Sequence, residues 1–342
     1  MTCAAQAEAP APKLANVTIL ATGGTIAGTG ASSTTTVGYT AATVGVQRLI
    51  QAVPELAKVA NVSGEQVFQI ASENMSNEHW LILAKRVNVL LAQPNVDGIV
   101  ITHGTDTLEE TAYFLNLVVK SRKPVVLVGA MRPSTAISAD GPINLYNAVL
   151  LAASPEAVGK GVLVAMNDQI QAAREVTKVN TSTLDAFRTP ELGMLGYIQG
   201  SRAFFYRQVV RKHTVDTEFD ISALQVLPQV DIVYGYANMG PVAIDAFMAA
   251  GSKGIIHAGV GDGSLAAKAV PALKSARAKG AVVVRASRVG QGILARNGEA
   301  NDDELDFVVA DTLNAQKARI LLMLALTKTG DTKEIQRMFY KY

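Results

Sequence analysis

The sequence predicts an α/β protein with two domains, a larger N-terminal one and a smaller C-terminal one, each built on a parallel sheet. Short runs rich in β-branched residues alternate with stretches that carry apolar residues at helical spacing. Strand followed by helix, repeated along a chain, is typical of parallel sheets covered by helices on both faces. A length of 342 residues is long for one domain and sufficient for two.

The predicted elements follow one another in a regular order. The clearest helical stretches are Asn77–Leu91 (NEHWLILAKRVNVLL) and Leu108–Val119 (LEETAYFLNLVV). The predicted strands are Val17–Ala21, Val67–Ala71, Gly98–Thr102, Val125–Val128 and Val162–Ala165 in the first domain, and Asp231–Tyr234, Gly254–Ala258 and Ala281–Arg285 in the second. Ligands of open parallel sheets bind beyond the carboxyl ends of the strands, so polar residues that follow these strands are candidate site residues.

The division into domains rests on an interruption of the alternation between predicted strands and helices. Between Phe204 and Leu227 the chain is charged and irregular. We therefore expect an N-terminal domain at 15–205, a linker at 206–228 and a C-terminal domain at 229–342. The leader, residues 1–14, is rich in Ala and Pro, and we expect it to be disordered. Its AQA tripeptide resembles the end of a secretory signal, although the charged and apolar regions are missing, so an exported protein and a cytoplasmic one both fit.

Composition excludes several classes of function. The 31 basic and 29 acidic residues nearly cancel, which gives no reason to expect nucleic acid or an anionic membrane as a partner. No apolar run reaches the roughly 20 residues that span a bilayer. Cys3 is the only cysteine, which excludes an internal disulfide, and the four histidines lack the spacing of a zinc site. We expect neither a metal nor a cofactor.

The stretch ILATGGTIAG, residues 19–28, places a glycine pair and Thr25 directly after a predicted strand. Gly23 and Gly24 permit positive φ and a close approach of backbones. Thr25 then has two interpretations, a helix cap or a nucleophile held on a tight turn. A phosphate-binding loop is a third possibility, but the lysine of a P-loop and the GxGxxG spacing are both absent.

The stretch ITHGTDTLEE, residues 101–110, follows another predicted strand. Asp106 with Glu109, or Thr107 with Glu110, forms a good capping box for the next helix. Capping leaves the preceding Gly104-Thr105 unexplained. A hydroxyl and a carboxylate at this strand end could instead hold a water molecule and a substrate ammonium.

Three further polar segments are ambiguous when taken singly. Ser72 and Glu73 precede a helix that Ser76 or Asn77 caps, and they fit either a solvated loop or a ligand site. Lys178 is either a surface charge or, if it points into the cleft, a proton shuttle. AGVGDGSLAAK, residues 258–268, is either a turn or a flexible polar loop that reaches a ligand.

ILATGGTIAG and GIVITHGTDTLEETAYFL together resemble the two signature segments of the bacterial L-asparaginases and glutaminase-asparaginases. The resemblance runs from about Leu14 to Tyr342 and includes KPVVLVGAMRPSTAISADGPINLYNAV and REVTKVNTSTLDAF. The type II branch, usually exported, fits best and implies a periplasmic protein. The family also implies a flavodoxin-like N-terminal domain, a smaller parallel-sheet domain and a homotetramer, a dimer of dimers whose active sites are shared between subunits.

The resemblance implies catalytic roles for five residues of this sequence. Thr25 matches the family's nucleophile, and Tyr39 matches the tyrosine of a mobile lid. Thr105, Asp106 and Lys178 match a second catalytic group.

It also implies a set of substrate-binding residues. Thr105 and Asp106 belong to this set as well as to the catalytic one. Ser72 and Glu73 match residues that bind the substrate's α-carboxylate and α-amino group. Ala130 lies where a backbone carbonyl receives the side-chain amide. Ser264 and Glu299 match positions that reach the site from the C-terminal domain of a neighbouring subunit.

The implied function is hydrolysis of L-asparagine to L-aspartate and ammonia through an ester on the threonine. Glu73 stands where some relatives have glutamine, and Ser264 where they have asparagine; both resemble the branch with more glutaminase activity. We therefore expect L-glutamine as a weaker substrate. The alternative class is a periplasmic amino-acid-binding protein, which needs two lobes and polar loops but no nucleophile.

Overall fold

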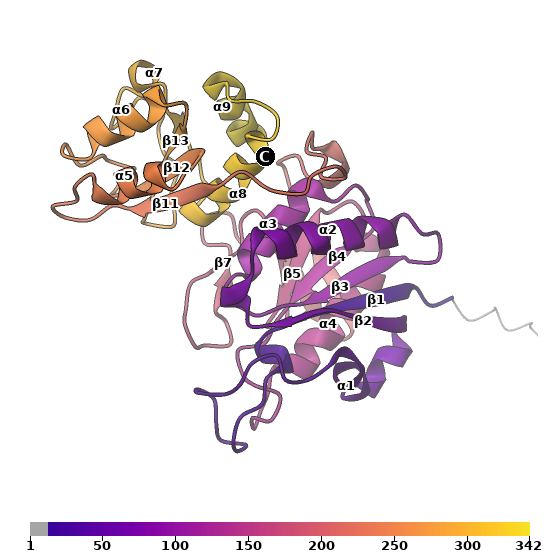
Figure 1. Ribbon diagram of the computed structural model, residues 1–342. Coiled ribbons are helices and arrows are strands. Elements are labelled where there is room, and N and C mark those ends of the chain that lie inside the picture. Colours follow the sequence, from indigo (N-terminus) through magenta and orange to yellow (C-terminus); the bar gives the residue numbers. More distant parts are fainter. Residues whose placement is uncertain (1–12) are drawn as a thin grey trace, which may run out of the picture.

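The computed structural model describes residues 13–342 and shows two α/β domains (Figure 1). Most of the predicted leader, and Cys3 within it, lies outside the described residues. All eight predicted strands are present, and the fold class expected from the sequence is confirmed. Among residues 13–342, no helix has both the length and the apolar character needed to cross a membrane.

The N-terminal domain contains an eight-stranded sheet in the order β10-β9-β6-β5-β4-β3-β1-β2. Strands β2, β1, β3, β4 and β5 are parallel, whereas β6, β9 and β10 continue the sheet in antiparallel pairs. The strands are β1 (Asn16–Gly23), β2 (Asn61–Ile70), β3 (Gly98–Thr102), β4 (Val125–Val128), β5 (Val162–Met166), β6 (Gln169–Ala172), β9 (Gly196–Gln199) and β10 (Arg202–Phe205).

This sheet is therefore mixed: the expected parallel strands form most of it, and three antiparallel strands that the sequence analysis did not identify extend one edge. Asn167 and Asp168, with φ of 51° and 60°, join β5 to β6 in a two-residue turn. Gly200 and Ser201, both with φ of 57°, join β9 to β10 in the same way. So short a connection can only produce an antiparallel hairpin, because parallel neighbours need a long crossover.

Helices cover both faces of this sheet, with α2 and α3 on one side and α1 and α4 on the other (Figure 1). The helices are α1 (Val46–Gln51), α2 (Asn77–Leu91), α3 (Leu108–Val118) and α4 (Gly141–Ala153). Short 3-10 turns are η1 (Thr25–Ala27), η2 (Pro54–Lys58), η3 (Ser72–Asn74), η4 (Pro155–Ala157) and η5 (Thr214–Asp216), and a separate ribbon pairs β7 (Thr177–Lys178) with β8 (Phe187–Arg188). Every residue of α3 except Glu110 is buried, because this helix packs against both β5 and the C-terminal domain.

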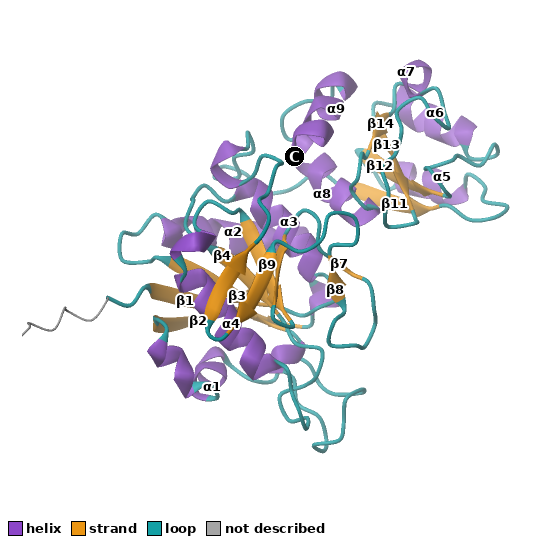
Figure 2. Cartoon of the chain, turned by 180° about the vertical axis from the view of Figure 1, so that it is seen from behind, coloured by secondary structure: helices purple, strands orange, loops and turns teal. Residues whose placement is uncertain are grey.

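The C-terminal domain is a parallel four-stranded sheet between two pairs of helices (Figure 2). Its elements are β11 (Val230–Tyr234), α5 (Val242–Ala249), β12 (Gly254–Gly259), α6 (Val270–Ala278), β13 (Val282–Ser287), α7 (Asp302–Leu305), β14 (Val308–Val309), α8 (Ala315–Ala325) and α9 (Thr332–Lys341). Helix α8 contacts the sheet of its own domain and also α3 of the N-terminal domain. It is therefore the main packing element between the domains.

The strand register brings the candidate residues to one edge of the larger sheet. Ala21 pairs with Thr102 on β3, and Thr102 pairs with Val128 on β4, so these three strands end at the same level. At this edge β2 ends with Ile70, beside Gly23 of β1. The polar segments that follow the four strands consequently converge.

Candidate active site

The glycine pair allows two strand-end loops to meet backbone to backbone. Gly23 has φ of 110°, and Gly24 has φ of 79° with ψ of −172°, a conformation essentially confined to glycine. A Cβ atom on Gly24 would lie 2.2 Å from the backbone nitrogen of Gly104. The turn after β1 is therefore held against the turn after β3.

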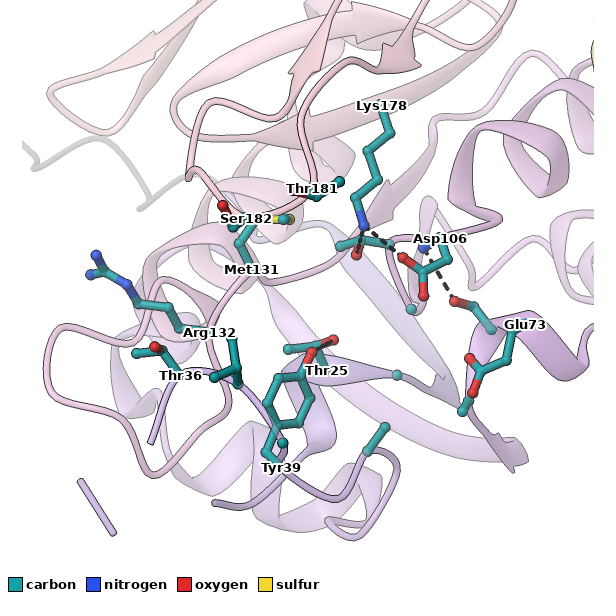
Figure 3. Close-up of a pocket in the computed structure, with 18 residues that line it drawn as sticks. Thr25, Thr36, Tyr39, Glu73, Asp106, Met131, Arg132, Lys178, Thr181 and Ser182 are labelled. Atoms are coloured by element: carbon teal, nitrogen blue, oxygen red, sulfur yellow. Dashed lines mark hydrogen bonds and ion pairs between the residues drawn. The ribbon is translucent and has the colours of Figure 1, made fainter. Parts of the chain in front are cut away.

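Thr25 follows this contact at the start of η1 and does not act as a cap. The N-cap of η1 is Gly24, and no side chain caps the turn. The Thr25 hydroxyl instead forms a 2.7 Å hydrogen bond with the Tyr39 hydroxyl, in which either oxygen can donate. Figure 3 shows the two side chains meeting in the cavity, although Thr25 is 7% exposed.

The second group consists of Lys178, Thr105 and Asp106. The Lys178 ammonium donates to the Thr105 hydroxyl at 2.9 Å and to the Asp106 carboxylate at 2.6 Å (Figure 3). The Lys178 side chain is 16% exposed and that of Asp106 is 61% exposed. The structure thus places Lys178 in the cleft, paired with Asp106, and the interpretation as an isolated surface charge was wrong.

The Asp106 and Thr107 side chains, which precede α3, bond to Lys178 and to the loop after β2 and do not cap the helix. Thr107 is the N-cap residue, but no side chain caps the helix, so neither of the two capping boxes that the sequence allowed is formed. The Thr107 hydroxyl donates to the carbonyl of Ser72 at 2.8 Å, and the Asp106 amide donates to the Ser72 hydroxyl at 3.2 Å. These bonds tie the loop after β2 to the loop after β3 and leave the Asp106 carboxylate free to pair with Lys178.

A cavity of about 480 Å³ joins these groups. Predicted site residues that line it are Thr25, Tyr39, Ser72, Glu73, Thr105, Asp106 and Lys178. Residues that the sequence analysis did not select are Thr36, Val37, Gly38, Ala41, Met131, Arg132, Thr181 and Ser182. These residues lie within a few positions of Tyr39, Ala130 or Lys178 in the sequence, and that proximity could have identified them as candidates. The Arg132 side chain points away from the Thr25–Tyr39 pair in Figure 3 and donates to the carbonyl of Ser138 at 2.9 Å.

Three predicted binding residues do not line this cavity. Ala130 is fully buried and lies two residues after the end of β4. Ser264 and Glu299 lie in the C-terminal domain, where the Ser264 hydroxyl donates to the Glu299 carboxylate at 2.9 Å. The structure brings these two side chains to each other, and not to the cavity of their own chain.

A buried hydrogen-bond chain supports the Gly104-Thr105 turn from behind, and the sequence analysis gave it no role. Nδ1 of His103 lies 2.7 Å from the carbonyl oxygen of Gly104, and Nε2 lies 2.9 Å from the Thr111 hydroxyl. The indole of Trp80 donates to the same hydroxyl at 2.8 Å. Because the Gly104 carbonyl can only accept, Nδ1 carries the proton and Nε2 accepts from Thr111. Burial lowers the pKa of His103 to about 4, so the ring stays neutral near pH 7.

The chemistry of the cavity comes from hydroxyl, amine and carboxylate groups. Within residues 13–342, no group of three or more His, Cys, Asp or Glu side chains could hold a metal ion. A hydroxyl beside a phenol, opposite a lysine paired with a carboxylate, is an arrangement suited to nucleophilic catalysis with proton transfer. The fold and this cavity define an α/β enzyme.

Comparison with known proteins identifies the family. Residues 16–211 match the model of the asparaginase N-terminal domain, and residues 229–339 match that of the glutaminase/asparaginase C-terminal domain. The chain therefore belongs to the asparaginase family, which confirms the relationship expected from the sequence motifs.

Individual relatives agree over nearly the whole chain. The glutaminase-asparaginase of Pseudomonas fluorescens biotype A is 56% identical over 96% of this chain and 91% of its own length. A Haemophilus influenzae protein named "Probable L-asparaginase periplasmic" is 50% identical over 97% of this chain and 94% of its own. The crystal structure of a "Probable Cytoplasmic L-asparaginase" from Campylobacter jejuni is 53% identical, with a TM-score of 0.94 over 96% of this chain and all of that one.

Proposed function

We propose that this protein hydrolyses the side-chain amide of L-asparagine to give L-aspartate and ammonia, with weaker activity on L-glutamine. The observation that carries the proposal is the 2.7 Å contact between the hydroxyls of Thr25 and Tyr39 in a cavity that also contains Lys178. The names of the relatives supply the substrate class. Glu73 and Ser264 support the glutamine activity, since they match the glutaminase branch in the family resemblance.

In the first half-reaction, Tyr39 accepts the proton of Thr25 while Oγ1 bonds to the amide carbon. Backbone N–H groups around Thr105 stabilise the oxyanion, and one such donor lowers a barrier by about 2.7–4 kcal/mol. The C–N bond then breaks as Tyr39 passes a proton to the nitrogen, which leaves as ammonia. The product is a β-aspartyl ester on Thr25.

In the second half-reaction, water hydrolyses this ester. The Thr105 hydroxyl lies 2.9 Å from the Lys178 nitrogen, so Thr105 can take the proton that the water loses while it passes its own proton to the amine form of Lys178. The hydroxide oxygen bonds to the ester carbon, and the bond to Oγ1 breaks. Thr25 regains a proton and L-aspartate is released.

Charge complementarity selects an α-amino acid. Asp106 and Glu73 pair with the substrate ammonium, while Ser72 donates to the α-carboxylate. The Ser72 hydroxyl oxygen accepts a hydrogen bond from the Asp106 amide, which leaves the hydroxyl hydrogen free to donate to the substrate. An amide that lacks either charged group would leave partners unpaired, which is costly in a closed site.

The remaining binding groups complete the site across subunits. The Ala130 carbonyl receives the side-chain amide, and Ser264 with Glu299 approaches from a neighbouring subunit of a homotetramer, a dimer of dimers. Ser264 and Glu299 lie in the C-terminal domain and outside the cavity of their own chain, which supports a role in the site of a neighbouring subunit. A light-scattering mass tests the assembly.

We place the protein in the periplasm, with the cytoplasm as the alternative. The relatives bear names of both kinds. We retain the division into a leader at 1–14, a catalytic domain at 15–205, a linker at 206–228 and a C-terminal domain at 229–342. The matched ranges 16–211 and 229–339 support this division.

Substitution of the nucleophile tests the reaction. Thr25→Ala removes the attacking oxygen, so ammonia release from L-asparagine should stop while the thermal unfolding midpoint changes little. Thr34→Ala is the matched control, because Thr34 is an exposed threonine outside the cavity. Near-normal turnover by Thr25→Ala would refute the assignment. Binding of asparagine without ammonia release by the unaltered protein would favour an amino-acid receptor.

A further inference from the structure

Lys317 of α8 is a buried cation of the C-terminal domain whose ammonium group contacts the N-terminal domain. Its side chain is 2% exposed. The ammonium donates to the carbonyl of Arg174 at 2.8 Å and to the carbonyl of Val176. Both carbonyls belong to the segment of the N-terminal domain that leads directly into β7, where Lys178 begins its reach towards Thr105.

The same turn of α8 also holds α3. Glu109, in the first turn of α3, is 5% exposed. Its carboxylate accepts from the Gln316 amide at 2.7 Å and lies 4.0 Å from the Lys317 ammonium. This first turn continues directly from the loop that carries Thr105 and Asp106.

We propose that Lys317 is a positioning residue for the Lys178–Thr105–Asp106 group, fixing the β7 segment and the start of α3 at the spacing that the proton path requires. The inference rests on the proposed function. Lys178 comes from one of these segments and Asp106 from the other, and their contact is 2.6 Å long. A displacement of about 1 Å at such a contact can cost two orders of magnitude in rate.

The charge of Lys317 suits this role. Burial lowers the pKa of Lys317 to about 8, while Glu109 and Glu175 oppose the change, so the ammonium form prevails at pH 7. An ammonium has three protons to donate. Two backbone carbonyls accept hydrogen bonds from it, and the Glu109 carboxylate, 4.0 Å away, adds an electrostatic contact.

A double-mutant cycle on the full-length chain tests the inference, with ammonia release from L-asparagine as the measurement. Lys317→Met should lower kcat by about tenfold or more. In a Lys178→Met background the same substitution should cause little further loss, because its effect passes through Lys178. Lys123→Met is the matched control: the Lys123 ammonium also donates to two backbone carbonyls, at 2.9 and 2.7 Å, but these belong to Leu91 and Gln93 at the end of α2. This control should keep kcat.

The outcomes separate the inference from the proposed function. An unchanged kcat in Lys317→Met, or losses that multiply in the double variant, would overturn the positioning role. If Lys317→Met does not fold, Lys317→Gln, which keeps a hydrogen-bond donor at this position, takes its place in the same cycle with Lys178→Met. Unaltered protein that releases no ammonia would overturn the proposed function and this inference together, whereas an active protein with multiplying losses overturns only the inference.

Discussion

Gly24 carries two separate constraints, one from its own backbone and one from its neighbour. Its φ of 79° and ψ of −172° lie in a region that side chains disfavour. The absent Cβ also leaves space for the Gly104 amide. Both constraints act on the turn that presents Thr25, so glycine at this position sets where the hydroxyl lies.

Gly24→Ala should therefore reduce both stability and turnover. We expect the free energy of unfolding to fall by about 3 kcal/mol, from backbone strain and overpacking together. Gly280→Ala is the control, because Gly280 also has a positive φ, 91°, but nothing lies within 4 Å of an added Cβ. It should cost about 1 kcal/mol and leave ammonia release unchanged. Equal losses in urea unfolding for the two variants would show that the contact with Gly104 has no energetic consequence.

Elements with strong local patterns were predictable from the sequence, and those defined by pairing were not. Buried runs such as Gly98–Thr102 and Val125–Val128 coincide with β3 and β4, since continuous β-branched residues specify a central strand. Strands β6, β9 and β10 have four residues each, too few to show a period. The capping alternative before α3 is not realised because Ser72 and Lys178 bind the same side chains, a tertiary effect that spacing does not reveal.

In the C-terminal domain, a buried ion pair joins the two loops that carry Ser264 and Glu299. Arg285 of β13 and Asp302 of α7 are both completely buried, with 2.8 Å between their charged atoms. The guanidinium also donates to the carbonyls of Asp262 and Ala295, both at 2.6 Å. One side chain thus links the loop after β12 to the loop before α7.

Removing one charge from this pair should be far more damaging than the same change next to it. Asp302→Asn leaves the Arg285 guanidinium buried without its counter-charge, and the free energy of unfolding should fall by about 3–5 kcal/mol. Asp303→Asn breaks an ion pair with Arg296 in which the aspartate is 65% exposed, and it should change stability little. Urea unfolding of the two variants provides the comparison. Similar losses would mean that burial does not govern the strength of the pair.

At the scale of the whole molecule, the site is assembled from segments that lie far apart in the sequence. The loops after β1, β2 and β3 were expected to share an edge, because parallel strands end together. The pairing of Lys178 with Asp106 depends on β7, a two-residue strand outside the main sheet. No local pattern around Lys178 could have predicted that contact, and its role came from the family resemblance.

Each domain also buries a neutral histidine, and this links stability to pH. Burial lowers the pKa of His103 in the N-terminal domain to about 4. Burial, with the nearby Arg285, lowers the pKa of His257 on β12 to about 4. The unfolded chain binds these protons near pH 6.5 and the folded one near pH 4, so stability falls as the pH drops through this window. Glu110 acts in the opposite direction, because burial raises its pKa to about 7 and acidification relieves that cost.

Substitution of His257 isolates the contribution of one histidine to the pH dependence of stability. Within residues 13–342, neither ring nitrogen has a hydrogen-bond partner, so an apolar residue should fit the site at no cost in polar contacts. His257→Leu should match or exceed the unaltered protein in stability at pH 7. Between pH 7 and pH 4.5 it should lose about 2 kcal/mol less, since one depressed histidine pKa contributes about that much over this interval. Urea unfolding at both pH values measures the difference, and equal losses in the two proteins would mean that His257 does not titrate on unfolding.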